Sequence, residues 1–377
     1  MAPLFLEEGS TILPDHFTFG EITFILGLLK ASYPLMQFFG SPLLGALSDR
    51  VGRKKVLSYA LVGSIFGYII FAIGILMDSV LLLFAGRIID GLTGGNISVI
   101  YSSIADISKD NEKTRNFGLV GMAFGVGFIF GPFLGGITSN PEIVSWFNYS
   151  TPFWLASILL LINFILVRIW FPETLKTRKE SRMNIFSGFQ NFAHAFSMKQ
   201  FRNLFSVIFL MFLGFTFFTQ FFDVFLIEKF KFDQSDIGRL FAYIGIWIAV
   251  TQGGITRLIS YKLSPPQVLR FSLLGVGIFL FALLIPDQSI YLLVVLPFVS
   301  LFHGLNQPNL LTLLSNSADE DIQGEVLGIN QSLQSLGFTI PPIIAGIIVS
   351  FDINLPLIVA GSCMLLAWLI FVLGRKY

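Results

Sequence analysis

Long apolar runs occupy most of the chain and constrain its fold more than any other feature. A helix needs about 20 apolar residues to cross roughly 30 Å of hydrocarbon, and eleven such runs are present, approximately at 22–47, 55–76, 80–106, 116–138, 151–171, 203–227, 237–258, 267–285, 289–315, 324–350 and 354–373. Backbone groups in lipid need partners within their own segment, so each run is expected to be a helix. With 54% hydrophobic and 12% charged residues, the chain is predicted to be an all-α polytopic membrane protein.

Basic residues gather in alternate loops between these runs. Lysine and arginine cluster at 50–55, 109–115, 176–202, 262–270 and 375–376, whereas the intervening loops hold few of them. Because cytoplasmic loops of membrane proteins are enriched in these residues, the pattern predicts a multi-pass protein of the cell membrane with a cytoplasmic C-terminus. With eleven spans, Met1 is then expected outside.

A weak internal repeat divides the chain. An offset of 210 residues pairs the following positions without a gap: Gly94 with Gly304, Asn96 with Asn306, Gly118 with Gly328, Gly127 with Gly337, Pro132 with Pro342, and Gly136 with Gly346. A near-constant offset across several helices indicates a duplicated architecture. We predict an N-terminal bundle of five visible spans at 1–171, a cytoplasmic linker at 172–202, and a C-terminal bundle of six spans at 203–377. The first ten residues align with the outer end of the span at 203–227, so we expect an intact design of six plus six with a truncated first helix.

The loop at 45–57 reads GALSDRVGRKKVL. Gly45 permits a close helix approach, Asp49 can pair at a helix end, and Gly52 allows a tight reversal. An ordinary basic turn would also explain Arg50 and Arg53, but the whole pattern is more specific than that.

The span at 116–138 carries a dense glycine pattern. Its members are Gly118, Gly127, Gly131, Pro132, Gly135 and Gly136. Small residues let helices meet backbone to backbone, and a proline bends a span by removing a hydrogen bond. Generic packing would explain a single pair of glycines better than it explains six placed residues.

These two patterns resemble those of the major facilitator superfamily. The loop matches its signature G-x-L-x-D-R-x-G-R-x-x-x-L, and the glycine pattern resembles the antiporter motif of its proton-coupled drug-efflux branch. The segment RIIDGLTGGNISVIYSSIADIS is similar to tetracycline-type pumps, although those carry an acidic residue where this chain has Gly67. The resemblance implies two pseudo-symmetric six-helix bundles, and a loop in which Asp49, Arg50 and Arg53 form a charged latch between the halves that stabilises the outward-facing state.

Ionisable residues within a span are costly and are therefore functional candidates. Asp90 lies ten residues into its span, about 15 Å deep at 1.5 Å per residue, and Arg87 is one turn away. We expect Asp90 to take up and release a transported proton, with Arg87 adjusting its affinity. The alternative is a static ion pair that orders the helix.

Polar residues inside other spans are candidates for a substrate cavity. Lys30 and Gln37 lie on one helical stripe, and Lys30 either extends toward the membrane surface or selects an anionic or zwitterionic substrate. His303 is expected to be a hydrogen-bonded helix contact rather than a proton carrier. The full set of cavity candidates is Lys30, Gln37, Asn96, His303, Asn306 and Gln307.

Together these features predict a secondary transporter that exports a small amphipathic or drug-like compound in exchange for protons. Uptake of a metabolite is the alternative, and a non-transporting membrane protein is a third possibility. We recognise no nucleophile, base and orienting group of an enzyme, and no phosphate-binding loop. The expected partners are a small molecule, protons and the lipid bilayer, without a cofactor, a metal or a nucleic acid, and the chain is expected to be a monomer.

Overall fold

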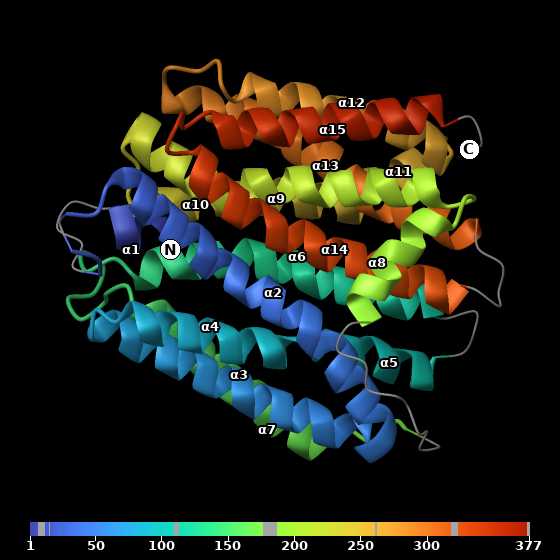
Figure 1. The fold of residues 1–377 in the computed structure, drawn as a ribbon, viewed down its shortest axis with the longest axis horizontal. Coiled ribbons are helices and arrows are strands. Elements are labelled where there is room, and N and C mark those ends of the chain that lie inside the picture. Colours follow the sequence, from blue (N-terminus) through green and yellow to red (C-terminus); the bar gives the residue numbers. More distant parts are fainter. Residues whose placement is uncertain are drawn as a thin grey trace.

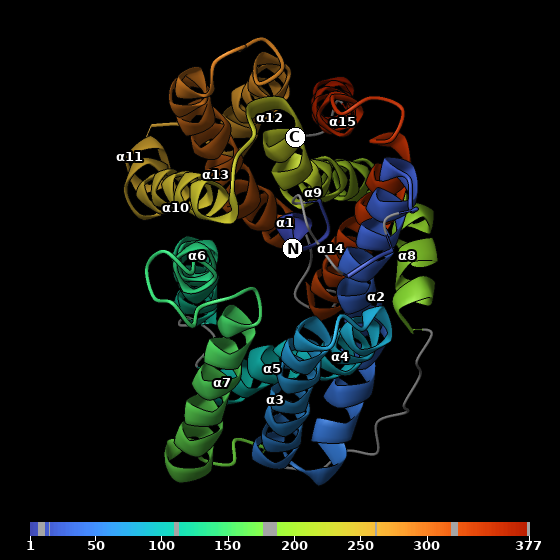
Figure 2. The ribbon, with the colours of Figure 1, turned by 90° about the vertical axis from the view of Figure 1, so that its left-hand side faces the viewer.

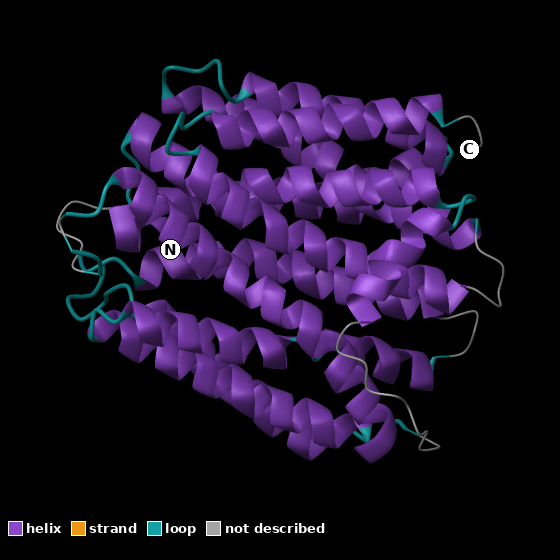
Figure 3. Ribbon diagram, viewed as in Figure 1, coloured by secondary structure: helices purple, strands orange, loops and turns teal. Residues whose placement is uncertain are grey.

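The computed structural model describes residues 1–6, 12–14, 16–108, 113–175, 187–260, 262–317 and 323–374. Over these ranges the chain forms helices and connecting turns, and no strand occurs within them (Figure 3). The long helices run roughly along one direction, as Figure 1 shows, and form an elongated bundle. The predicted all-α fold is therefore confirmed.

The first half of the chain supplies one group of helices. They are α1 (Ala2–Leu6), α2 (Phe19–Val51), α3 (Arg53–Leu76), α4 (Val80–Gly94), α5 (Ile97–Ile107), α6 (Lys113–Thr138) and α7 (Thr151–Trp170). The short helix α1 is buried and contacts α2 and α9.

The second half supplies the remaining helices. They are α8 (Ser187–Ser197), α9 (Arg202–Phe230), α10 (Gln234–Val250), α11 (Thr256–Ser260), α12 (Pro265–Ala282), α13 (Leu292–Asn316), α14 (Gln323–Ile348) and α15 (Leu355–Leu373). A π-helical turn, Thr251–Ile255, joins α10 to α11, and a short 3₁₀ turn, Ser289–Tyr291, precedes α13.

Each of the eleven predicted runs corresponds to one helix or to consecutive helical segments. The run at 80–106 is divided into α4 and α5 around Gly95 and Asn96. Eight segments of the described chain are long and apolar enough to cross a membrane, while α6, α14 and the segment from α10 to α11 are not among them. The segment predicted as a linker, 172–202, contains α8, which packs against α2, α9 and α14.

Local sequence explains where several helices begin. Thr18 caps α2 by accepting a hydrogen bond from the Glu21 backbone, and the Glu21 carboxylate accepts one from the Thr18 backbone N–H at 2.8 Å. Asp233 and Asp236 form the same reciprocal arrangement at the start of α10. These capping boxes satisfy backbone donors that the first helical turn leaves free.

The two ends of the bundle differ in charge. We call the end that carries the α2–α3 turn, α8 and the last residues of α15 the basic end, and the end that carries α1 and the α3–α4 turn the opposite end (Figure 1). Arg50, Arg53, Lys54 and Lys55 lie at the basic end.

The most extensive contacts between the halves are those of α2 with α14 and of α6 with α10. Figure 2, which views the bundle from the opposite end, shows α6 facing α10 and α2 beside α14. A Cβ atom added at Gly27 of α2 would lie 3.1 Å from the Gly346 Cα of α14, and one added at Gly136 of α6 would lie 3.1 Å from the Gly238 Cα of α10. Gly136 and Gly346 are partners in the 210-residue repeat, so equivalent glycines make equivalent contacts between the halves.

Helix α9 lies at the centre of the second half. Its buried phenylalanines include Phe205, Phe217, Phe218, Phe221, Phe222 and Phe225, each at most 2% exposed. Helices α14 and α15 pack along it. The position of α9 matters for function because it carries a charged residue that faces the first half.

Candidate functional site

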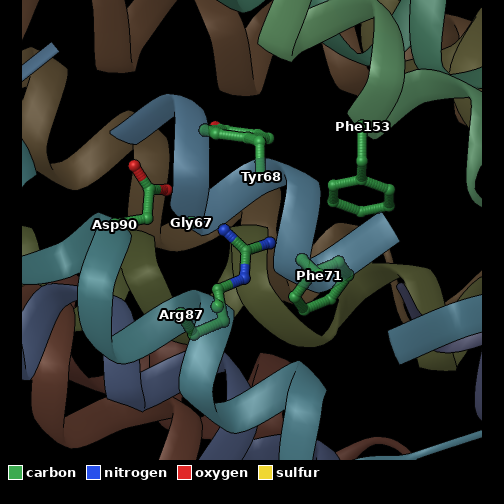
Figure 4. A pocket seen from close by; sticks show the side chains of 7 residues that line it. Gly67, Tyr68, Phe71, Arg87, Asp90 and Phe153 are labelled. Carbon is green, nitrogen blue, oxygen red and sulfur yellow. The ribbon is translucent and has the colours of Figure 1, made fainter. Parts of the chain in front are cut away.

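Helix α4 positions two charged side chains inside the bundle. Asp90 is 5% exposed, and together with Arg87 it lines a narrow pocket with Gly67, Tyr68, Phe71, Gly86 and Phe153 (Figure 4). Asp90 lies ten residues after the first residue of α4 and Arg87 lies seven after it, depths of about 15 Å and 10 Å along the helix.

Glycines let α3 and α4 approach closely at this pocket. A Cβ atom at Gly67 would lie 2.8 Å from the Asp90 Cβ and 2.9 Å from the Gly86 carbonyl oxygen. Any side chain at position 67 would therefore collide with α4. This contact gives a physical reason for a glycine at position 67.

Hydroxyl groups surround the other side of Asp90. Ser64 of α3 is close to its carboxylate, and the Ser64 hydroxyl lies 2.9 Å from the Thr93 hydroxyl. Thr93 also donates to the Ile89 carbonyl oxygen at 2.9 Å. The carboxylate thus has polar neighbours, although its surroundings are largely protein.

Arg87 does not lie within ion-pair distance of Asp90. Its guanidinium carbon lies 4.8 Å from the centroid of the Phe71 ring, and its Nη2 contacts the sulfur of Met1 at 3.7 Å. The Arg87 Nε is buried and has no hydrogen-bond partner among the described residues. Figure 4 shows the guanidinium reaching between Gly67 and Phe71, with Asp90 beside Gly67.

The alternative interpretation, a static ion pair between Arg87 and Asp90, is therefore not found among the described contacts. Ion pairs are found elsewhere in the described chain, but none joins these two residues within 4.0 Å. Residues three apart on a helix can meet. Here, however, the Phe71 ring holds the guanidinium against α3, so the two charges are separately placed.

A buried ion pair instead connects the two halves. The Lys30 ammonium of α2 lies 2.8 Å from a carboxylate oxygen of Asp223 of α9, and the two side chains are 6% and 13% exposed. The ammonium also donates to the Gln220 carbonyl oxygen and lies 4.9 Å from the Phe221 ring centroid. Lys30 consequently does not extend to the membrane surface, and its charge is already compensated.

Asp223 was not among the residues predicted from the sequence. The signal was available, because FFTQFFDVFL places a carboxylate inside an apolar run, and such residues are functional candidates by default. What the sequence could not show is its partner. Lys30 and Asp223 are 193 residues apart and meet only when α2 packs beside the second half.

The polar residues of α13 are spread over more than one face. The His303 ring stacks on Phe215 of α9 with 3.3 Å between ring centroids, and its Nδ1 has no hydrogen-bond partner among the described residues. The predicted hydrogen-bonded contact is therefore a ring stack. Asn306 accepts a hydrogen bond of 2.5 Å from the Ser272 hydroxyl of α12, while Gln307 is exposed.

The remaining cavity candidates lie in the first half. Gln37 of α2 donates from Nε2 to the Gly94 carbonyl oxygen of α4 at 3.0 Å. Asn96 stands at the start of α5 and is partly exposed. Neither lines the pocket that contains Asp90.

The basic loop forms a charged network at the basic end. Arg53 is 6% exposed and contacts three side chains, with Nη1 at 2.6 Å from Asp49, Nη1 at 2.6 Å from Ser48, and Nε at 3.1 Å from Asp106 of α5. The Glu173 carboxylate accepts a hydrogen bond of 2.9 Å from the Arg53 backbone N–H.

This network lies within the first half. In the described chain the partners of Asp49 and Arg53 all belong to that half, so in this conformation these two residues tie α2 and α3 to α5 and to the segment after α7. The latch between the halves, expected for an outward-facing state, stays a prediction. Gly52 has a φ of +109°, which confirms the predicted tight reversal, because residues with a side chain rarely adopt this conformation.

The glycine pattern of α6 makes fewer helix contacts than its density suggests. Gly136 meets Gly238, and the Pro132 carbonyl oxygen lies 2.9 Å from a Cβ placed at Gly238. Positions 127, 131 and 135, in contrast, have no neighbour within 4 Å of an added Cβ. Helix α6 continues through Pro132. The surroundings of Gly118 lie outside the described residues.

The repeat partner of Gly127 is more closely packed than Gly127 itself. A Cβ placed at Gly337 would lie 2.8 Å from the Phe212 side chain of α9, whereas one placed at Gly127 meets no neighbour within 4 Å among the described residues.

Comparison with known proteins gives consistent matches. A family model described as Major Facilitator Superfamily matches residues 10–342 and 259–377. The class C tetracycline resistance protein of Escherichia coli is 30% identical over 321 residues, which cover 84% of this chain and 78% of that protein. Multidrug resistance protein 2 of Bacillus subtilis (strain 168) is 27% identical over 344 residues, which cover 90% of this chain and 84% of that protein.

Solved structures share the fold. The crystal structure of the human organic anion transporter MFSD10 (TETRAN) aligns with a TM-score of 0.71 and 22% identity, over 92% of this chain and 83% of that one. A D-xylose–proton symporter aligns with a TM-score of 0.76 and 16% identity, over 96% and 89% of the two chains. At these identities the similarity concerns the fold alone.

Proposed function

The chain belongs to the major facilitator superfamily, and on this premise we propose that it exports a small amphipathic compound across the cell membrane in exchange for protons. This family consists of transporters rather than enzymes. Similarity to tetracycline and multidrug resistance proteins over most of the chain supports a role in efflux. Proton coupling and the identity of the cargo are part of the proposal.

The Asp90 carboxylate is the observation that carries the proposal. It is 5% exposed, lies about halfway through a span, and has no ion-pair partner within the described residues. A carboxylate that no cation neutralises is well placed to bind a proton in a medium of low polarity. We therefore retain Asp90 as the proton carrier, whereas Arg87 acts on it over a distance rather than through an ion pair.

The packing supports alternating access. Close glycine contacts between the halves lie near the opposite end, where Gly27 meets Gly346 and Gly136 meets Gly238. We propose that the basic end faces the cytoplasm, following the distribution of lysine and arginine, and that the structure represents an inward-facing state. In such a state the Arg53 loop has no need to bridge the halves, which agrees with its contacts inside the first half.

Relatives named for tetracycline resistance suggest a tetracycline-like cargo. Inward transport of a metabolite is the competing direction.

A vesicle experiment tests the function. The purified chain is reconstituted in liposomes, a pH gradient is imposed, and movement of a fluorescent amphipathic compound is followed. We expect transport against the proton flow in the unmodified chain and its loss in Asp90→Asn, with Asp287→Asn, a change at an exposed loop carboxylate, as the matched control. Transport that ignores the gradient, or that runs in the same direction as the protons, would contradict export by antiport.

A further inference from the structure

The Lys30–Asp223 ion pair contains a buried titratable carboxylate that proton exchange at Asp90 does not use. The Lys30 Nζ atom reaches both oxygens of this carboxylate, at 2.9 Å from Oδ1 and 2.8 Å from Oδ2. The Val224 backbone N–H is a further donor, and its nitrogen lies 3.0 Å from Oδ1. Both described partners of the carboxylate are donors, so this conformation favours its ionised form.

A proton and the Lys30 ammonium compete for the same two oxygens. An ammonium donates hydrogen bonds and accepts none, and a protonated carboxyl group is itself a donor through its O–H. A proton on Asp223 would therefore remove the negative charge and set a donor against a donor. Because attraction between opposite charges is strong in a medium of low polarity, the closed pair excludes the proton, and a protonated Asp223 releases Lys30.

The pair lies at the inner edge of the contact that closes the opposite end. A Cβ atom placed at Gly27 of α2 would lie 3.1 Å from the Gly346 Cα of α14. Lys30 follows Gly27 by less than one helical turn, which is about 5 Å along the helix axis. Since α2 belongs to the first half and α9 to the second, the halves cannot separate at this end while Lys30 stays on Asp223.

The elements packed around the pair carry few other charges. The Met1 amino group interacts electrostatically with both members, and Arg87 of α4 contacts the Met1 sulfur. Helices α1 and α15 have no charged side chain, whereas α14 has Glu325 and α8 has His194, whose side chains lie outside the described residues. The other charged side chains of α2 and α9 are Glu21, Asp49, Arg50, Arg202, Glu228 and Lys229. In the described chain, one cationic side chain therefore contacts the carboxylate of the pair, and its loss would leave that charge unbalanced.

We propose that Asp223 is a second proton-binding residue, which takes up a proton when the opposite end opens and releases it when Lys30 returns. On opening, the carboxylate forms one O–H bond and the ammonium keeps its own protons. On closing, that O–H bond breaks, the ion pair forms again, and the proton leaves toward the basic end, because the glycine contacts lie on the other side of the pair. This inference rests on the proposed function, since it assigns a residue to the conformational step of the same exporter.

Distances between two nitroxide labels measure this opening without transport. The full chain in phospholipid nanodiscs carries Cys363→Ser and two labelled cysteines at exposed positions of the opposite end, Met77→Cys in the first half and Phe351→Cys in the second. Double electron–electron resonance then reports the populations of short and long distances. As the pH is lowered, the ratio of open to closed molecules should rise by up to about tenfold per pH unit, because one proton is bound on opening.

Variants of the pair assign the response to these two residues. Asp223→Asn imitates the protonated group and Lys30→Met removes its competitor, so the long distance should dominate in both at every pH. Asp223→Glu keeps a carboxylate and should restore the pH response. Asp287→Asn, at an exposed loop carboxylate, is the matched control and should respond like the unmodified chain.

An unmodified chain whose distances ignore the pH would overturn the proposal. A pH response that survives in Asp223→Asn, or that Lys30→Met leaves unchanged, would overturn it as well. If the single variants do not fold, the double variant Lys30→Met with Asp223→Asn decides, because replacing both members of a buried pair is often close to neutral for stability. The double variant should show no pH response, and a response like that of the unmodified chain would contradict the competition.

Vesicles with an imposed pH gradient separate this inference from the proposed function. Opening that depends on pH through Asp223, without gradient-driven export, would contradict the exporter and leave the second proton site standing. Gradient-driven export that continues at the unmodified rate in Asp223→Asn would support the exporter and overturn the second proton site.

Discussion

Neutralising one member of the Lys30–Asp223 pair should destabilise the protein more than neutralising both. The pair joins α2 to α9, the two side chains are 6% and 13% exposed, and the charged atoms are 2.8 Å apart. Lys30→Met removes the positive charge and keeps the apolar stem, while Asp223→Asn removes the negative charge with little change in shape.

The size of the effect follows from the distance and the burial. Two unit charges at 2.8 Å attract by about 6 kcal/mol at an effective dielectric constant of about 20, and the cost of removing them from water offsets much of this attraction. Leaving one member of a buried pair alone typically costs about 3 to 5 kcal/mol, whereas replacing both is often close to neutral. We expect a coupling free energy of at least about 2 kcal/mol between the two substitutions.

The two single variants should also differ from each other. In Asp223→Asn, the Lys30 ammonium keeps the Gln220 carbonyl oxygen and the Phe221 ring as neighbours. In Lys30→Met, the Val224 backbone N–H, at 3.0 Å, is the one hydrogen-bond donor that the described residues leave to the Asp223 carboxylate. Lys30→Met is therefore expected to cost more than Asp223→Asn.

Unfolding by dodecyl sulfate in mixed micelles measures these free energies for the unmodified chain, both single variants and the double variant. Lys229→Met is the matched control. The Lys229 ammonium donates to the Leu284 carbonyl oxygen and packs near Phe225, but it has no carboxylate partner in the described chain. Additive costs in the cycle, or an equal cost for Lys229→Met and Lys30→Met, would refute the reasoning.

Loss of the Lys30–Asp223 ion pair should also make the opposite end open more readily, because the two halves cannot separate there while this ion pair is intact. Thr23 of α2 is fully buried at this interface, where its carbonyl oxygen is 2.6 Å from a Cβ placed at Gly346. In a background in which Cys363 is replaced by serine, Thr23→Cys should react faster with an impermeant maleimide when Lys30→Met is also present. An unchanged rate would show that the pair does not hold this end closed.

Two glycine substitutions test the packing between helices. Gly136→Ala places a Cβ 3.1 Å from Gly238 and should lower the free energy of unfolding by about 1 kcal/mol. Gly135→Ala meets no neighbour within 4 Å and should raise it by about 0.5 to 1 kcal/mol, because alanine favours the helix more than glycine does. If both changes shift the free energy of unfolding in the same direction, the described α6–α10 contact is contradicted. Gly67→Ala collides with the Asp90 Cβ at 2.8 Å and with nearby backbone, so it should cost about 2 to 3 kcal/mol and weaken transport, and a fully active, fully stable variant would be inconsistent with the α3–α4 geometry.

Much of the architecture could be predicted because it depends on local pattern. Apolar runs long enough to cross a bilayer must be helices, and each predicted run is helical in the structure. The repeat likewise located Gly136 and Gly346, which make equivalent contacts between the halves. What the glycine pattern could not indicate is which positions meet a neighbour, because that depends on helices far away in the chain.

In the candidate site, too, the sequence predicted which residues matter but not which residues they contact. The sequence identified Asp90, Arg87 and Lys30 as charges inside spans, since the cost of such residues is a property of each segment. It could not assign their partners. Helical spacing allowed Arg87 to pair with Asp90, but in the structure the described contacts of the guanidinium are the Phe71 ring and Met1. The carboxylate that neutralises Lys30 comes from the other half.

The sequence by itself therefore determined the helices, the duplicated plan and the presence of charges within the spans. Each span must be long enough and apolar enough to cross the hydrocarbon interior, and both properties depend on that segment alone. Only the tertiary structure decided that Lys30 is neutralised by Asp223 and that Arg87 has no carboxylate partner among the described residues. Electrostatic attraction acts over a few ångströms of space without regard to distance along the chain. Which charges meet depends on how α2 and α4 pack against α3 and α9.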